Sequence, residues 1–316
     1  MRLSILIFFT VFIAVAQDFS GIESKVEGYP GLLTADKLAT TIKKDFPKKE
    51  DQVKALYRWL TKNIRYDLEE FYNPNRQTKT RFRYRTPEER EQKLQEIRDK
   101  TVSETLSKRR AVCEGYARTF AKVSDLMGIE NEVIEGYVRN SSNSIGNPRK
   151  QPNHAWNAVK LNGKWIYIDA TWGAGSESNG KWIRRFNPYY YNIPATKYFK
   201  THLPEKSIWR LRVGRIEKED FYKQPIYSHD FLKSNVNLVS PKSGIVKRNA
   251  KGAIKMVLTN AADKEILIGF LGSSIAQRPS VVTKGKNTTV TISPPPNANV
   301  CFLLIDREVA IEFLIN

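Results

Sequence analysis

Two alternating segments joined by Asn162-Gly163 constrain the fold of this chain more than any other feature. Residues 154–161 (HAWNAVKL) and 164–172 (KWIYIDATW) have the pattern of two strands on either side of this dipeptide. Asn-Gly between alternating runs is the strongest short-range signal of a β-hairpin, because both residues tolerate the positive φ of a two-residue turn. The sequence therefore predicts an antiparallel hairpin with a fixed register.

The register of this hairpin brings a histidine near an aspartate. Counting outward from the turn, Trp156 falls opposite Asp169. His154 then falls opposite Thr171, and the period of 2 along a strand places all four side chains on one face. His154 and Asp169 become diagonal neighbours, with Cβ atoms at most ~7–8 Å apart. The pair predicts an imidazole oriented as a base by a carboxylate, or alternatively a structural contact at a sheet edge. The opposite face is a predicted core face: Val159, Leu161, Ile166 and Ile168.

Cys113 lies at the start of a predicted helix. Apolar residues recur after it at spacings of 3 and 4 as far as Met127, and Gly128 is typical of a helix C-terminus. The partial positive charge of a helix start lowers the pKa of a thiol, and a neighbouring histidine can take its proton. The spacing leaves two interpretations open, a nucleophile served by His154 or an ordinary buried thiol.

The rest of the chain indicates two domains. Residues 34–45 and 48–64 have helical apolar spacing, and residues 86–89 (TPEE) are typical of the start of a polar helix reaching about Arg98. Residues 131–139 are typical of a strand.

From about residue 224, short apolar runs separated by Gly, Asn, Asp and Pro predict a small β-sandwich. We therefore expect domains over residues 17–222 and 223–316.

The first 16 residues are typical of a secretory signal peptide. Arg2 precedes a short apolar run that ends in Ala-Val-Ala, so we expect cleavage after Ala16 and a secreted or periplasmic protein. The run is shorter than the ~20 residues of a membrane span, although an uncleaved signal anchor is the alternative. Cys113 and Cys301 are the only cysteines and fall in different predicted domains, so we expect two unpaired thiols, with Cys301 a buried apolar residue.

The chain carries a formal net charge of +19, which limits the classes of partner that it is expected to bind. Arginines at 81, 83 and 85 alternate with aromatic residues, a pattern that binds single-stranded nucleic acid or forms an edge strand or a solvated loop. Because we expect export, we predict no nucleic acid; acidic envelope or matrix polymers are the charged partners that fit, and a solvated lysine-rich surface is the alternative. His202 and His229 show no metal-binding spacing with the cysteines, so we expect no metal and no cofactor.

Residues 111–138 (AVCEGYARTFAKVSDLMGIENEVIEGYV) and 153–175 (NHAWNAVKLNGKWIYIDATWGAG) resemble the transglutaminase-like superfamily. They are most similar to the branch that includes the kyphoscoliosis peptidase and many exported bacterial proteins. The resemblance covers about residues 35–222. It implies an α+β fold, a papain-like core of helices packed on an antiparallel sheet, with a catalytic triad of Cys113, His154 and Asp169. A small Ig-like β-sandwich after the core also suits this branch.

The resemblance implies acyl-transfer chemistry. A Cys113 thiolate would attack an amide carbon and form a thioester, while His154 passes a proton to the leaving amine and Asp169 orients His154. We expect a peptidase or amidase that acts on a protein or peptide substrate, with water as the acyl acceptor. Two alternatives are a transglutaminase, in which an amine takes the acyl group, and a non-catalytic envelope or matrix binding protein with a relic triad.

Overall fold

A computed structural model describes residues 18–73 and 82–316 of the chain. The predicted signal peptide (residues 1–16) and Arg81 lie outside the described residues. Within them, no helix is both long enough and apolar enough to cross a membrane.

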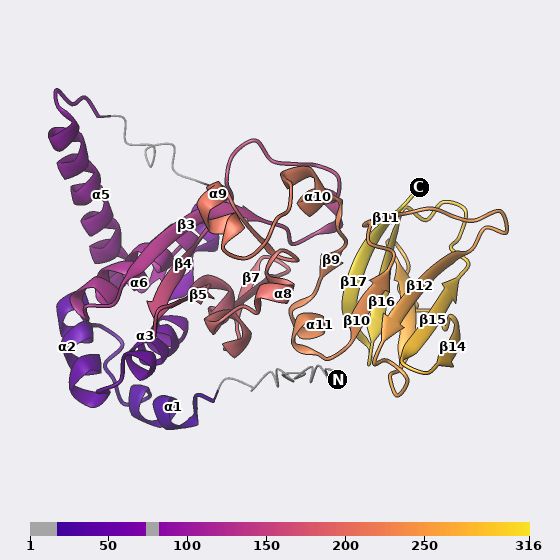
Figure 1. Ribbon diagram of the computed structural model, residues 1–316, viewed down its shortest axis with the longest axis horizontal. Coiled ribbons are helices and arrows are strands. Elements are labelled where there is room, and N and C mark those ends of the chain that lie inside the picture. Colours follow the sequence, from indigo (N-terminus) through magenta and orange to yellow (C-terminus); the bar gives the residue numbers. More distant parts are fainter. Residues whose placement is uncertain (1–17, 74–81) are drawn as a thin grey trace, which may run out of the picture.

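The described chain has an α+β fold, as expected (Figure 1). Its helices are α1 (Ser20–Val26), α2 (Ala35–Asp45), α3 (Lys49–Asn63), α4 (Leu68–Tyr72), α5 (Pro87–Lys108), α6 (Cys113–Leu126), α7 (Ala170–Ala174), α8 (Ala195–Tyr198), α9 (Ser207–Leu211), α10 (Lys218–Lys223) and α11 (His229–Lys233), with 3₁₀ helices at Ser142–Ser144 and Pro188–Tyr191. Its strands are β1 (Arg65–Tyr66), β2 (Arg110–Ala111), β3 (Asn131–Val138), β4 (His154–Leu161), β5 (Lys164–Ile168), β6 (Gly175–Ser178), β7 (Lys181–Arg184), β8 (His202–Pro204), β9 (Ile226–Tyr227), β10 (Asn237–Ser240), β11 (Ile245–Val246), β12 (Ile254–Thr259), β13 (Ile266–Phe270), β14 (Ser280–Lys284), β15 (Asn287–Ile292), β16 (Val300–Ile305) and β17 (Glu308–Ile315).

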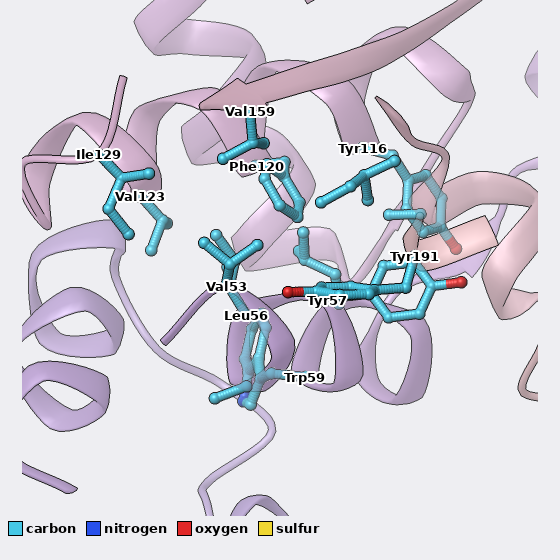
Figure 2. Close-up of a cluster of buried hydrophobic side chains, with 14 of the residues drawn as sticks. Val53, Leu56, Tyr57, Trp59, Tyr116, Phe120, Val123, Ile129, Val159 and Tyr191 are labelled. Atoms are coloured by element: carbon cyan, nitrogen blue, oxygen red, sulfur yellow. The ribbon is translucent and has the colours of Figure 1, made fainter. Parts of the chain in front are cut away.

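The N-terminal part is built on an antiparallel sheet with strand order β5-β4-β3-β8. Helix α6 packs on one face of this sheet, and α2, α3 and α5 pack around α6. Large buried side chains fill the space between α3, α6 and β4, where Tyr57, Phe120 and Val159 are fully buried (Figure 2). This core fixes the start of α6 relative to the end of the sheet.

The predicted hairpin is confirmed, with one correction. Asn162 and Gly163 both have positive φ, and pairing runs from Leu161 opposite Lys164 outward as far as Asn157. The predicted continuation of the second strand to residue 172 is wrong, because β5 ends at Ile168 and the chain turns into α7. The predicted pairs of Trp156 with Asp169 and of His154 with Thr171 therefore do not form.

Helix α5 is longer than predicted. The Thr86 side chain accepts a hydrogen bond from Glu89 N, which confirms the predicted cap. The helix does not stop near Arg98 but continues to Lys108, because Val102 and Leu106 in its last turns are buried against the core.

The C-terminal part consists of two β-sheets of short strands (Figure 1). One has the order β10-β12-β15-β14, and the other the order β11-β17-β16-β13 with β9 beside β17. Buried side chains of both sheets, among them Met256, Val290 and Phe313, form one hydrophobic cluster. The Ig-like identity of this part and the domain boundary at residue 222/223 stay predictions.

Candidate functional site

Cys113 is the first residue of α6, and the helix begins there as the sequence predicts. The preceding residue, Val112, has extended backbone and provides no side-chain cap. Cys113 is a partly buried free thiol, whereas Cys301 is a fully buried one. Burial raises the pKa of Cys301 to about 12, which fits its prediction as an inert apolar residue.

His154 and Asp169 are in direct contact. His154 Nε2 lies 2.7 Å from Asp169 Oδ2, and both side chains are almost completely buried. Asp169 reaches this position as the N-cap of α7, because its Oδ1 accepts hydrogen bonds from the backbone N–H groups of Thr171 and Trp172 at 2.9 and 3.0 Å. The contact predicted from a continued strand is therefore made by a helix cap one residue beyond the strand.

The structure also brings Cys113 to His154. Burial alone lowers the pKa of His154, but the negative charges of Asp169 and Cys113 and their hydrogen bonds outweigh burial and raise it to about 10. The pKa of Asp169 is well below its usual range, because its interactions with His154 and His202 outweigh its burial. Because Nε2 is hydrogen-bonded to Asp169, Nδ1 is the ring nitrogen of His154 left to interact with the thiol.

His202 is a member of this site that the sequence did not reveal. Its side chain is fully buried, with Nε2 3.0 Å from Asp169 Oδ2 and Nδ1 2.8 Å from Thr201 Oγ1. Burial lowers the pKa of His202, so it is neutral at pH 7 and donates Nε2–H to the carboxylate. His202 stands 33 residues after Asp169 and has no metal-binding spacing in the sequence, and the pairing of β8 with β3 brings it to the site.

The three buried side chains also have the composition of a metal site. One ligand atom each of His154, Asp169 and His202 lies within 4.8 Å of the others. The two nitrogens, however, sit at hydrogen-bond distances of 2.7 and 3.0 Å from one oxygen. Ligand atoms around a tetrahedral zinc ion are about 3.3 Å apart for bonds of ~2.0–2.1 Å. These residues therefore fit a hydrogen-bonded cluster better than a metal centre.

Replacing His202 with Phe is expected to lower the free energy of unfolding by about 1–3 kcal/mol, because a buried carboxylate loses one donor and the Thr201 hydroxyl loses one of its two partners. Urea unfolding at pH 7 measures the change. Thr201→Val, which removes only the far end of the chain of hydrogen bonds, is the matched control and should cost less. Equal stability of His202→Phe and wild type would contradict the bonding described above.

Comparisons with known proteins relate the N-terminal part of the chain to one superfamily. Residues 36–170 match the sequence pattern of the Transglutaminase-like superfamily. The chain is 22% identical over 233 residues to the mouse kyphoscoliosis peptidase (70% of this chain, 32% of that protein) and 22% identical over 263 residues to the human one (78% and 37%). It thus spans about a third of the length of these relatives. A solved structure of a TGase is 17% identical with a TM-score of 0.29, over 56% of this chain and 37% of that chain.

The matched segment includes Cys113 at the start of α6, His154 on β4 and Asp169 at the cap of α7. His202 and the C-terminal sheets lie beyond it. Residues 36–170 are therefore similar to the Transglutaminase-like superfamily, and the chain is distantly homologous to the kyphoscoliosis peptidases.

Proposed function

We propose that the chain is a cysteine-dependent acyl-transfer enzyme, a peptidase or amidase whose catalytic residues are Cys113, His154 and Asp169. The observation that carries this proposal is the buried His154, whose raised pKa keeps it protonated at neutral pH between a carboxylate and a thiol. An imidazolium in this position stabilises a thiolate and holds a proton for a leaving group.

The proposed reaction has two steps. The Cys113 thiolate attacks the carbonyl carbon of an amide, the C–N bond breaks, and His154 gives its proton to the leaving amine, so that a thioester forms. Neutral His154 then takes a proton from water, the resulting hydroxide attacks the thioester, and the acid and the thiolate are released while His154 is again protonated. Asp169 stays ionised throughout and holds Nε2–H of His154, which leaves Nδ1 free to exchange the proton.

Two groups near the thiol are candidates to stabilise the oxyanion. Cys113 stands at the start of α6, where backbone N–H groups have no partner within the helix. Burial raises the pKa of Tyr66, and the negative charges of Cys113 and Asp169 raise it further, so its hydroxyl stays protonated and can donate. We propose the N–H of Cys113 as one donor and Tyr66 as a candidate for the second.

The family of the core supports a second candidate, protein cross-linking, in which an amine replaces water as the acyl acceptor. We favour hydrolysis, because water needs no second binding site. Peptide cleavage and incorporation of a labelled primary amine, followed side by side for wild type and Cys113→Ser, distinguish the two reactions. On the sequence of residues 1–16 we also propose that the enzyme is exported.

Alkylation of Cys113 tests the proposal without a known substrate. At pH 6.5 an ordinary thiol is only about 1% thiolate, so wild type should react with iodoacetamide at least about tenfold faster than His154→Ala. Mass spectrometry after trypsin digestion locates the label, and buried Cys301 serves as the internal control. Equal rates in the two proteins, or no reaction of Cys113 in the folded state, would favour a non-catalytic binding protein instead.

A further inference from the structure

One edge of strand β3 is paired along only half of its length. Strand β8 pairs with residues 136–138, and the backbone N–H of Glu205 reaches Glu135 O just beyond. Over residues 131–134, no strand among the described ranges pairs with this side of β3. Over residues 131–134, β3 is therefore paired with β4 on one side and is a free sheet edge on the other.

The backbone groups of Val133 point toward this edge. Glu130 O accepts a hydrogen bond from Lys160 N on the β4 side, whereas Glu135 O accepts one from Glu205 N on the β8 side. Because successive residues of an antiparallel strand bond to alternate sides, the even-numbered residues of β3 face β4 and the odd-numbered ones face the free edge. Asn131 and Val133 thus each present an N–H and a C=O there, and the described part of the chain supplies no backbone partner for them.

A groove of about 410 Å³ follows this edge. Helices α5 and α6 form the wall of the groove on one face of the sheet. This is the face from which the Asn157 side chain of β4 donates a hydrogen bond to Ala117 O of α6. The turn after β8 and helix α9 form the other wall, on the opposite face of the sheet. There Trp209 of α9 packs edge-to-face on Trp165 of β5. The edge therefore lies in a slot between two walls, and a strand placed in it would send its side chains alternately to each wall.

One end of the groove lies near Cys113. Arg118, which lines it, stands five residues after Cys113 on α6, about 7.5 Å along the helix axis. Its guanidinium lies 3.5 Å from Glu114, the residue after Cys113, and 3.5 Å from Glu135 at the end of the free edge. A chain bound along β3 would thus lead toward the thiol.

We propose that this groove binds an extended polypeptide segment, which pairs with Asn131 and Val133 as an additional strand. A peptide backbone carries donors and acceptors at the spacing that a strand edge requires, and edges of this kind bind peptides by strand addition. Residues of both signs of charge line the groove, which favours a polar segment with mixed charges: Arg98, Lys122 and Lys206 against Glu132, Glu135 and Glu205. The occupant is the substrate chain, a choice that rests on the proposed function.

The test uses the full chain with Cys113→Ala, which binds without turnover, and β-casein, an unfolded polypeptide, as the probe. Hydrogen exchange should slow at the backbone amides of Asn131 and Val133 when β-casein is added. Val133→Pro removes an N–H that faces the groove and leaves the ladder to β4 intact. It should weaken β-casein binding about tenfold in fluorescence anisotropy, since one hydrogen bond is lost and the proline ring obstructs the edge. Val133→Thr keeps the N–H and the side-chain shape and should bind as the parent does.

The inference is overturned if β-casein gives no protection at these two amides, or if Val133→Pro binds as tightly as Val133→Thr. This outcome is distinct from failure of the proposed function, which is read from alkylation of Cys113 in proteins that retain the thiol. In that background, Val133→Pro should react with iodoacetamide at the wild-type rate, which also shows that the variant is folded around the site.

Discussion

Asp169→Asn is expected to reduce turnover about 10⁴-fold at pH 7, in whichever acyl-transfer reaction the wild type supports, while the protein stays folded. The asparagine Oδ1 can still accept from Thr171 and Trp172 N–H and keep the cap of α7. Its amide nitrogen then faces His154 Nε2, which must become an acceptor and move the ring proton to Nδ1, beside Cys113. The imidazole would hold the wrong tautomer and lose its charge.

Three measurements check this expectation. Turnover gives the main effect, and alkylation of Cys113 at pH 6.5 should slow at least about tenfold, as in His154→Ala. The pKa of His154, read from its imidazole resonances, should fall well below about 10, because Cys113 alone then opposes the effect of burial. Asp67→Asn is the matched control, because Asp67 is another buried cap residue that binds Arg110 and not His154. An equally large loss of turnover in the control would indicate that the effect of Asp169→Asn comes from misfolding and not from His154.

The same pair predicts how stability depends on pH. His154 has a raised pKa in the folded state, so its contribution is complete below pH 6.5 and is lost as the pH rises toward about 10. Asp169 has a lowered pKa, so its contribution is present above about pH 4 and is lost on acidification. Urea unfolding between pH 3 and 10 should show a larger loss of stability at both ends of this range in wild type than in Asp169→Asn.

Gly136→Ala is expected to lower the free energy of unfolding by about 3 kcal/mol. Gly136 lies on β3 between His154 of β4 and Pro204 of β8. An added Cβ would run into the carbonyl oxygen of Leu203 and lie 2.9 Å from Pro204 Cα and 2.6 Å from Trp156 Cη2. Two of these neighbours are backbone atoms and the third is a fully buried ring, so none can move aside without separating strands that carry the site.

Urea unfolding of the purified chain measures this loss. Gly269→Ala is the matched control, because Gly269 also lies in a strand but its added Cβ would meet only ordinary contacts, at 3.5 Å or more. The control should change stability by less than about 0.5 kcal/mol. Similar effects of the two substitutions would show that close packing at Gly136 is not what excludes a side chain.

Local chemistry made the central hairpin predictable. The Asn162-Gly163 turn requires positive φ at both residues, and that requirement fixed a register which the structure confirms as far as Asn157 and Ile168. The start of α6 at Cys113 was predictable for the same kind of reason, from helical spacing over consecutive residues. Features set by neighbours in sequence could thus be deduced from the sequence.

Features set by distant neighbours could not be deduced in this way. The alternating pattern of residues 164–172 does not reveal that β5 ends at Ile168. A helix cap at Asp169 competes with continued strand pairing, and the packing of α7 decides between the two. The polar composition of residues 87–108 does not reveal the length of α5, because contact with the core is what stabilises the last turns of this helix.

The sequence by itself determined the hairpin, its register and the helix that begins at Cys113, because backbone preferences and side-chain periodicity act over a few residues. Only the tertiary structure decided that the helix start meets His154, that His202 shares Asp169, and that one edge of β3 has no strand partner over residues 131–134 within the described chain. Each of these depends on elements far apart in the chain, held in place by a buried core whose packing no local pattern encodes.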